Sequence, residues 1–205
     1  MTIFVASDIH FNHRNILKYC PHRRSGRPMP ETDYDIANMV SDMNEKIVAN
    51  WNNVVEPEDE VFILGDVAMG QIDKAPALIR RLNGLKHLIK GNHDKSLVKH
   101  INKSDGDFNS YKSLFASIHD VLEMGHKTEA GKKVSLFMSH YPHHSWNGMN
   151  QGAIMLHGHL HGSPHTVTGR IKDVGIDTNN LFPYRMDAVV EEMLKIETIR
   201  SHHDD

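Results

Sequence analysis

Short apolar runs recur along the chain, and the segments between several of them have a different hydrophobic spacing. Six runs have the length and apolar content typical of strands: residues 2–6, 61–64, 87–89, 134–138, 154–156 and 171–176. Strand-like runs that alternate with helical segments are typical of an α/β protein. We therefore expect the α/β class.

The helical segments carry apolar residues three and four positions apart, which places those residues on one stripe. The clearest is residues 32–51, with Thr32 or Asp33 as its N-cap. Further helices are expected over 72–82 and 186–196. These stripes predict packing against a core rather than cofactor sites.

Two segments depart from this alternation. Around Gly131 the sequence reads as two strands joined by a turn, which predicts antiparallel pairing in the second half of the chain. Residues 18–30 contain four cations and three prolines, which favours an irregular loop over a helix. We expect Arg23, Arg24 and Arg27 of this loop to be solvated, and selection of a polyanionic substrate is the alternative.

Length, charge and cysteine content limit the protein classes. The 205 residues fit one domain, residues 1–200, followed by a polar tail at 201–205. A net charge of −3 excludes a strongly basic chain that holds nucleic acid by its overall charge. Cys20 is the single cysteine and permits no intramolecular disulfide, and no apolar run approaches bilayer length. We expect a cytoplasmic protein without a membrane partner.

Side chains that bind metals follow five of the strand-like runs, and the chain holds 17 histidines in all. Five blocks stand directly or one residue after apolar runs: Ser7-Asp8-Ile9-His10, Gly65-Asp66-Val67, Gly91-Asn92-His93-Asp94, Ser139-His140-Tyr141-Pro142 and His157-Gly158-His159-Leu160-His161-Gly162. Ligands of open α/β sheets bind beyond the carboxyl ends of the strands. The five blocks are therefore expected to converge.

Each block alone also has a structural interpretation. Asp-x-His and Gly-Asp are common in turns, and Asn-His-Asp can satisfy a turn through side-chain hydrogen bonds to the backbone. Three histidines within five residues are harder to explain, since burying them without partners is costly. The five blocks in series favour metal binding over these interpretations.

A mixture of carboxylate, imidazole and amide oxygen suits hard and borderline divalent ions, and one carboxylate can bridge two of them. The spacing suggests one ion on Asp8, His10 and one late histidine, and a second ion on Asn92, His140 and another late histidine. Asp66 would lie between the two ions. Spacing alone does not distinguish the roles of the late histidines.

In this order the five blocks resemble the signature of the calcineurin-like metallophosphoesterase superfamily, which is DxH, GD, GNH followed by D or E, a single H, and GHxH. They span about three quarters of the chain. The resemblance implies two packed mixed β-sheets flanked by helices, an αββα sandwich. It also implies two divalent ions, with Mn²⁺ expected first and Fe, Ni, Zn or Mg as alternatives. The implied ligands are Asp8, His10, Asp66 and His161 for one ion, and Asp66, Asn92, His140 and His159 for the other.

The opening SDIHFNHRNIL is also similar to a small bacterial and phage-type subgroup, in which the DxH is followed by a further histidine, here His13, and then Arg14. After Gly65-Asp66 the chain reads VAMG, whereas the serine/threonine phosphatases carry DRG. This departure disfavours a protein-phosphatase role.

The resemblance implies hydrolysis of a small phosphate ester or a nucleotide by a metal-activated hydroxide. His93 is the candidate proton donor to the leaving group, and Asp94 would orient its imidazole, with a helix N-cap as the equal alternative. His13 and Arg14 would contact phosphate, and a surface role for them is the alternative.

Two rival functions follow from the same residues. A nuclease or phosphodiesterase acting on DNA or RNA is disfavoured, because aromatic residues make up only 7% of the chain and a single basic loop is present. A non-catalytic metal-binding scaffold of the same fold predicts missing ligands, and none is missing. No sequence pattern predicts an oligomeric state.

Overall fold

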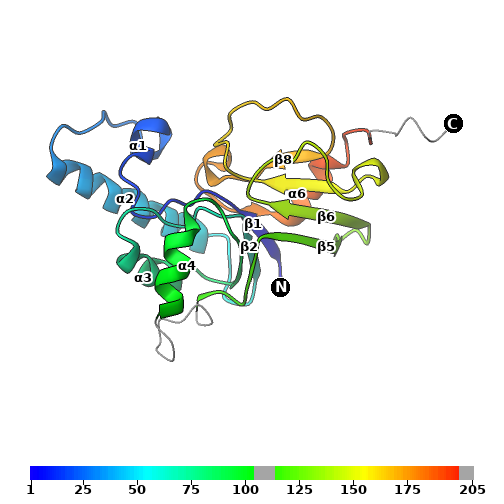
Figure 1. The fold of residues 1–205 in the computed structure, drawn as a ribbon, viewed down its shortest axis with the longest axis horizontal. Coiled ribbons are helices and arrows are strands. Elements are labelled where there is room, and N and C mark those ends of the chain that lie inside the picture. Colours follow the sequence, from blue (N-terminus) through cyan, green and yellow to red (C-terminus); the bar gives the residue numbers. More distant parts are fainter. Residues whose placement is uncertain (104–113, 199–205) are drawn as a thin grey trace.

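Two mixed β-sheets pack face to face and are flanked by helices (Figure 1). This computed structural model describes residues 1–103 and 114–198, so the expected tail at 201–205 lies outside the described residues. The predicted fold class is confirmed.

The first sheet is mixed and has the strand order β4-β3-β2-β1-β9. Its strands are β1 (Ile3–Ala6), β2 (Glu60–Ile63), β3 (Leu85–Ile89), β4 (Ser117–His119) and β9 (Tyr184–Arg185). The first four strands are parallel, and β9 pairs antiparallel with β1. The carboxyl ends of β1, β2 and β3 therefore lie along one edge of the sheet.

The second sheet has the order β5-β6-β7-β8. Its strands are β5 (Val121–Lys127), β6 (Lys133–Ser139), β7 (Ile154–His157) and β8 (Ile171–Asp173). β5 and β6 form the antiparallel pair predicted around Gly131, whereas β6, β7 and β8 are parallel.

Helices and short 3-10 segments occupy the connections. The described helices are α1 (Ile16–Tyr19), α2 (Asp33–Asn52), α3 (Ala75–Arg80), α4 (Asp94–Lys103) and α6 (Met186–Met193), and the 3-10 segments are η1 (Pro21–Arg24), η2 (Ile72–Lys74), η3 (Met149–Gln151) and η4 (Ile176–Asn179). In the described part of the chain, no helix has both the length and the apolar character needed to span a bilayer.

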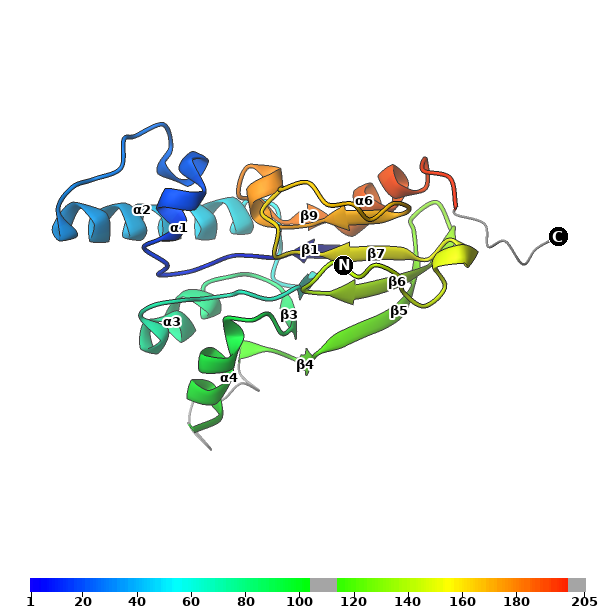
Figure 2. The ribbon, with the colours of Figure 1, turned by 45° about the horizontal axis from the view of Figure 1, so that its top comes forward.

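Alternate residues of β1 face two different cores, as the period of two in a strand requires. Phe4 and Ala6 belong to the core that the first sheet shares with α2, α3 and α4. Val5 belongs to a second core between the sheets, together with Leu156 of β7 and the apolar face of α6. Figure 2 shows α2, α3 and α4 beyond one end of the strands of the second sheet.

The outer face of the second sheet has its own apolar cluster. Phe137 and Met155 pack there against Trp146, which comes from the connection between β6 and β7. The indole N–H of Trp146 donates to the carbonyl of Ala153 at 3.0 Å. In the described residues a loop therefore covers these side chains.

The longest predicted helix agrees closely with the structure. α2 begins at Asp33, and the side chain of Thr32 caps it by accepting a hydrogen bond from the backbone N–H of Asp35 at 3.1 Å. The expected helix over 72–82 is divided into η2 and α3, with Pro76 in the first turn of α3, where a proline is tolerated. The expected helix over 186–196 ends at Met193.

Two other expectations were wrong. The predicted strand over 171–176 ends at Asp173, because the Asp173 carboxylate accepts the backbone N–H of Gly175 at 2.8 Å and turns the chain. The basic segment 18–30 is not wholly irregular, since it contains η1. Pro21 opens this 3-10 helix at a position where its missing N–H has no cost.

Candidate metal centre

Backbone hydrogen bonds hold the loops after β1 and β2 side by side. The N–H of Asp8 donates to the carbonyl of Gly65 at 3.0 Å, and the N–H of His10 donates to Asp66 at 2.9 Å. These contacts extend the parallel pairing of β1 and β2 past the ends of both strands. They bring two of the predicted metal-binding blocks to one place.

Five candidate ligand residues have left-handed backbone conformations. Their φ angles are 57° at Asp8, 55° at His10, 54° at Asp66, 72° at His159 and 49° at His161. Such conformations cost residues other than glycine about 1–3 kcal/mol each and cluster where the surrounding structure enforces them. The local strain is thus concentrated on the residues that the sequence marked for metal binding.

Asp8, His10 and His161 form one group of possible ligands. The Oδ1 atom of Asp8 lies 3.8 Å from Nε2 of His10 and 3.9 Å from Nε2 of His161. These separations exceed a hydrogen bond, but they suit ligand atoms that each stand about 2.1 Å from one shared cation.

Asp66 lies between this group and a second one. Its Oδ2 atom is 3.6 Å from Nε2 of His10 and 3.6 Å from Nε2 of His140. The Oδ1 atom of Asn92 is 3.0 Å from the same nitrogen of His140. A single carboxylate therefore faces imidazoles on both sides, as the sequence predicted for a bridging ligand.

His159 completes the second group. Its ring centroid is 5.2 Å from that of His140, and its backbone N–H donates to Oδ2 of Asp8 at 2.9 Å. The structure thus brings all seven predicted ligand residues together. The third late histidine, His157, is directed elsewhere, with Nδ1 bonded to the carbonyl of Gly158 at 2.8 Å.

The hydrogen bond at Nδ1 of His140 directs the other ring nitrogen, Nε2, toward the centre. Its Nδ1 atom is 2.7 Å from the carbonyl of Leu64, which can only accept, so Nδ1 carries a proton. In the neutral ring Nε2 then presents a lone pair toward the oxygens of Asn92 and Asp66. Lone pairs that face one another repel, and a cation between them turns the repulsion into binding.

Four buried side-chain atoms lack a hydrogen-bond partner in the described part of the chain, and two of them, Oδ1 of Asp8 and Nε2 of His10, belong to the centre. Burial raises the pKa of Asp8 to about 6 and lowers the pKa of His10 well below its usual value. Unpaired buried polar atoms are rare and costly. The carboxylate and histidine groups present here could hold a metal ion that satisfies both atoms.

A buried network orients His161 from behind. Its Nδ1 atom is 2.6 Å from Oδ2 of Asp177, and the guanidinium of Arg23 bonds both oxygens of that carboxylate at 2.7 Å. Burial opposes a charge on His161, but hydrogen bonds to Asp177 and Cys20 and the charge of Asp8 outweigh it and raise its pKa to about 10. Carboxylates that hold the far nitrogen of a metal-binding histidine are a common supporting feature.

The expectation that Arg23 is solvated was wrong, since the residue is only 1% exposed. Its guanidinium also donates to the carbonyls of Asp8 at 2.6 Å and Ile9 at 2.9 Å. A buried arginine needs acceptors for its donors, and the loop after β1 supplies them. Arg24 and Arg27 do lie nearer the surface, where Arg27 pairs with Asp42.

Two glycines allow the loops to approach one another. A Cβ atom on Gly91 would lie 2.3 Å from Oδ1 of Asp66, and one on Gly158 would lie 2.4 Å from Oδ2 of Asp8. Ser7 is closer still, with its Oγ atom 1.9 Å from the Cβ position of Gly158. Any side chain at these positions would displace a carboxylate of the site.

Asp94 is fully buried at the start of α4. Its carboxylate accepts backbone N–H groups of Asp66 at 2.8 Å, Val67 at 2.9 Å and Gly91 at 2.8 Å. Both oxygens are therefore bonded to the loops that carry Asp66 and Asn92. These hydrogen bonds tie the two loops to each other, and they match neither the orientation of His93 nor a cap of α4, because none of the three donors lies in α4 or in the His93 ring.

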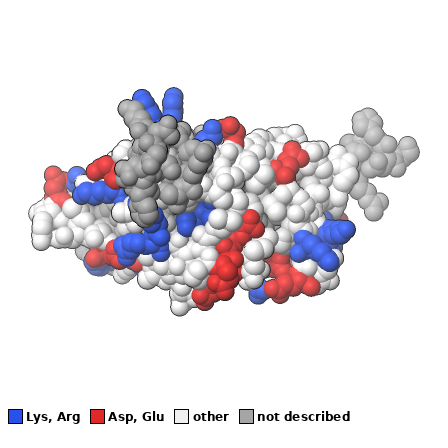
Figure 3. All heavy atoms as spheres, turned by 90° about the horizontal axis from the view of Figure 1, so that it is seen from below, with Lys and Arg blue, Asp and Glu red and all other residues white. Residues whose placement is uncertain are grey.

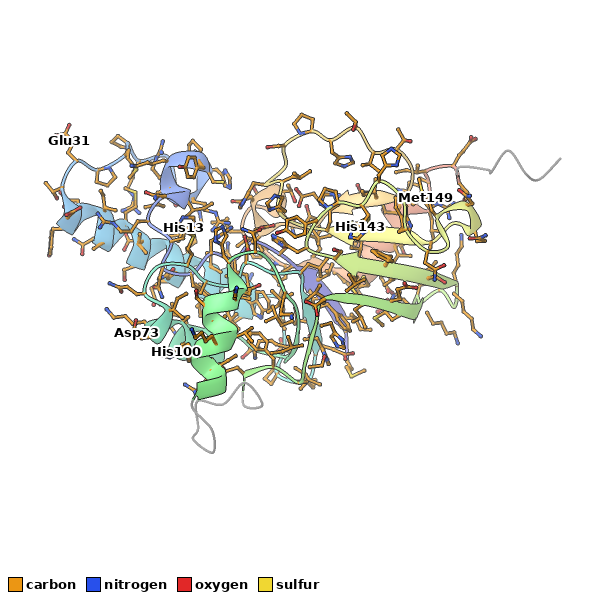
Figure 4. The ribbon with its side chains drawn as sticks, in the orientation of Figure 1. His13, Glu31, Asp73, His100, His143 and Met149 are labelled. Atoms are coloured by element: carbon orange, nitrogen blue, oxygen red, sulfur yellow. The ribbon has the colours of Figure 1, made fainter. Side chains whose placement is uncertain are left out.

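His93 and His13 lie at the rim of the centre. The Nε2 atom of His93 is 3.8 Å from Oδ2 of Asp66, and its ring centroid is 6.3 Å from that of His13. Nδ1 of His13 is 3.3 Å from Nδ1 of His10. Arg14 is exposed and pairs with Asp33. Figure 4 shows His13 between the helical part of the molecule and the second sheet.

Sequence reasoning missed two carboxylates that support the centre. Asp173 accepts the backbone N–H of Gly162 at 2.9 Å, and Asp177 holds His161. Both come at or just after the end of β8, which is the same position that marked the other blocks. The overextended strand prediction over 171–176 concealed Asp173, whereas Asp177 directly follows that predicted run and could have been found by the same rule.

No family model matches the chain. It is 30% identical over 210 residues to the uncharacterized protein MJ1445 of Methanocaldococcus jannaschii, and the match covers 98% of this chain and 97% of that protein. The chain belongs to the family of this archaeal protein. It is also similar to the Gene 66 protein of Mycobacterium phage D29, with 28% identity over 217 residues, 95% of this chain and 97% of the phage protein.

A solved structure shares the fold of this family member. The crystal structure of AQ665, a protein of unknown function from Aquifex aeolicus, matches with a TM-score of 0.62 and 22% identity. The match covers 93% of this chain and 98% of the Aquifex chain. Nearly the whole architecture is therefore found in an experimentally determined protein.

Proposed function

We propose that the chain is a phosphoesterase that depends on two divalent ions and hydrolyses a small phosphate ester or a nucleotide. The observation that carries the proposal is the position of Asp66, whose Oδ2 atom lies 3.6 Å from an imidazole nitrogen on each side. The resemblance of the five sequence blocks to the calcineurin-like metallophosphoesterases supports the same function.

Each ion would be held by one side of the centre. The proposed ligands are Asp8, His10, Asp66 and His161 for the first ion, and Asp66, Asn92, His140 and His159 for the second. When bound, a divalent pair supplies positive charge for phosphoryl oxygens and lowers the pKa of a nearby water. Mn²⁺ is the proposed metal, as the resemblance implies, and a set of oxygen and nitrogen donors without thiolate suits a hard or borderline divalent ion.

His93 is the proposed proton donor to the leaving oxygen. It follows Asn92 in the chain, and its side chain is 34% exposed, so the ring can reach a substrate as well as the centre. Its backbone N–H donates to Oδ1 of Asp66 at 2.9 Å, which fixes the residue beside the bridging carboxylate. A positioned imidazole of this kind typically contributes about 10²–10⁴-fold to the rate.

His13 and Arg14 are the proposed phosphate contacts. Burial and the nearby charge of His93 lower the pKa of His13 to about 4, so its ring is neutral at physiological pH and can donate one hydrogen bond. The guanidinium of Arg14 has a geometry that matches phosphate oxygens. Its pairing with exposed Asp33 is weak enough for an anion to replace it.

Metal removal and return test this function. Treatment with EDTA should abolish hydrolysis of bis-p-nitrophenyl phosphate, and added Mn²⁺ should restore it, with nitrophenolate absorbance as the readout. His93→Ala should then slow turnover far more than it reduces bound metal. A metal-loaded protein that hydrolyses neither this ester nor nucleotides would instead support a non-catalytic metal-binding scaffold.

A further inference from the structure

A cavity of about 750 Å³ lies beside the metal centre at the start of α4. Its wall combines three lysines with apolar and aromatic side chains: Lys90, Lys95, Lys99, Val98 and Tyr141, together with Gly91 and Asp120. In Figure 3, which views the molecule from below, Lys and Arg side chains occur at several places on the surface, with Asp and Glu side chains among them. None of these lysines belongs to the five metal-binding blocks.

The cavity adjoins the centre through two of its residues. Gly91 directly precedes Asn92, and Tyr141 directly follows His140. The ring centroid of Tyr141 lies 5.0 Å from that of His140 and 4.8 Å from that of His159. Tyr141 is nevertheless 46% exposed, so it presents an aromatic surface next to two proposed ligands.

The cavity has an excess of positive charge, because three lysines and one aspartate line it. Lys90 pairs with Asp120 at 2.7 Å, whereas no ion pair joins Lys95 or Lys99 to another described residue. These two lysines are four residues apart on α4 and therefore share one helix face. Like charges at this spacing repel, and an anion between them relieves the repulsion.

We propose that this cavity binds the part of the substrate beyond the scissile phosphate, and that the substrate is a nucleotide with a second phosphate group. The second phosphate would lie between Lys95 and Lys99, and the base would pack on Tyr141 and Val98. This inference rests on the proposed phosphoesterase function. It goes further than that function, because the metal centre would contact only the scissile phosphate and the cavity would select a nucleotide.

The chemistry of the cavity favours a nucleotide over a simpler phosphate ester. A sugar phosphate has no aromatic face to pack on Tyr141, and inorganic phosphate would use only the lysines. Stacking on an aromatic side chain contributes about 1–3 kcal/mol per base.

In the reaction, water forms a new bond to phosphorus, the bond to the leaving oxygen breaks, and a proton passes from water to that oxygen. The second phosphate takes no part in these bond changes.

The test compares two substrates that differ only in the second phosphate, adenosine 3′,5′-bisphosphate and 5′-AMP. We expect the wild-type protein loaded with Mn²⁺ to have the higher kcat/KM for the bisphosphate. In Lys95→Gln/Lys99→Gln the ratio of the two kcat/KM values should fall roughly tenfold, the usual loss when charge-assisted hydrogen bonds are removed. Lys127→Gln/Lys132→Gln, which removes the same charge from the β5–β6 hairpin, is the matched control and should keep the ratio.

Tyr141 is tested by a pair of variants. Tyr141→Leu should weaken binding of the bisphosphate, and Tyr141→Phe, which keeps the ring, should preserve it. Bound metal is measured for both variants, because the ring touches His140 and His159. Equal binding by the leucine and phenylalanine variants at equal metal content would contradict stacking of the base.

Binding by the metal-free protein separates this inference from the proposed function. Isothermal titration with adenosine 3′,5′-bisphosphate should give measurable binding that Lys95→Gln/Lys99→Gln removes and the control variant retains. If the metal-loaded protein hydrolyses no phosphate ester while this binding persists, the phosphoesterase proposal fails alone. A wild type with no preference for the bisphosphate in either assay, or a preference that survives in Lys95→Gln/Lys99→Gln, would overturn the cavity assignment.

Discussion

Both carboxylate oxygens of Asp66 lie close to other groups of the centre. Its Oδ2 atom faces His10 and His140, its Oδ1 atom accepts the backbone N–H of His93 at 2.9 Å, and its backbone is left-handed. An asparagine has nearly the same shape but lacks the charge. The carboxylate charge can therefore be removed with little change in packing.

Asp66→Asn should reduce bound Mn²⁺ and abolish metal-dependent hydrolysis while the fold is retained. The physical reason is that a neutral amide oxygen cannot balance two divalent ions as a bridging carboxylate does. Metal analysis by mass spectrometry and far-UV circular dichroism measure the two effects. Asp73→Asn, an exposed aspartate outside the centre, is the control, and wild-type metal content in Asp66→Asn would contradict the bridging role.

The affinity for metal should rise with pH. The pKa of His161 is raised to about 10, so its Nε2 must lose a proton when an ion binds, and the pKa of Asp8 is raised to about 6. A metal ion therefore competes with the proton on His161 and, at lower pH, with the proton on Asp8. The logarithm of the affinity should increase by about one per pH unit between pH 6 and 8, and by about two per unit below pH 6.

Calorimetric titration of Mn²⁺ between pH 5 and 8 measures this slope. Asp177→Asn removes the carboxylate that raises the pKa of His161, so the slope above pH 6 should flatten in that variant. An affinity of the wild type that does not change with pH would show that His161 and Asp8 are not ligands.

Asp177→Asn should also weaken metal binding directly. Loss of a carboxylate behind a ligating histidine typically costs about 10–100-fold in affinity. The variant also leaves the guanidinium of Arg23 buried without its charged partner, and such a loss destabilises a protein by about 3–5 kcal/mol. Asp187→Asn, which breaks the pairing with His126 away from the centre, is the control. Equal metal affinity in both variants would contradict the supporting role of Asp177.

At the scale of elements, the centre depends on loops that pass very close to one another. Gly158 follows β7 and packs on Ser7 and Asp8, which follow β1. The carboxyl ends of neighbouring parallel strands lie side by side, so the side chains that follow them need little further chain to meet. The close approach of these two loops is therefore a structural requirement of the site.

Gly158→Ala should lower both the thermal stability and the metal content. The new Cβ atom would stand 1.9 Å from Oγ of Ser7, and overpacking of this kind typically costs about 1–3 kcal/mol. Gly125→Ala is the matched control, because a Cβ atom on Gly125 meets nothing within 4 Å. Calorimetric melting with and without Mn²⁺ measures both effects, and a Gly158→Ala variant that melts like Gly125→Ala would contradict the close packing.

The elements with strong periodicity could be predicted from the sequence, whereas the short ones could not. α2 was found nearly to the residue, because its apolar stripe is long and Thr32 supplies a recognisable cap. β4 and β9 have three and two residues, too few for an alternating pattern to appear. α4 was expected only as the alternative in which Asp94 is the N-cap of a following helix, and Asp94 is instead the first residue of that helix.

For the whole molecule, the convergence of the five blocks follows from the topology. Parallel strands place their carboxyl ends at one edge, and the packing of the two sheets brings the ends of β6 and β7 to the ends of β1, β2 and β3. The sequence could predict this meeting, because each block follows an apolar run. The sandwich itself was predicted only through the resemblance, since hydrophobic periodicity does not show which sheets pack together.

Partners that are distant in sequence and lack a motif could not be predicted. Arg23 and Asp177 are 154 residues apart, and their buried pairing depends on the final packing of η1 against η4. A basic residue in a segment rich in proline is usually solvated, so local composition indicated the wrong environment. The structure was needed to connect this pair to His161.

A crystal structure of the protein soaked in Mn²⁺, with anomalous scattering recorded, tests the central claim most directly. We expect two anomalous peaks per chain, one beside Asp8, His10 and His161 and the other beside Asn92, His140 and His159, with the carboxylate of Asp66 between them. A centre without Mn²⁺, a single peak that Asp66 does not touch, or peaks confined to other parts of the molecule would contradict the account.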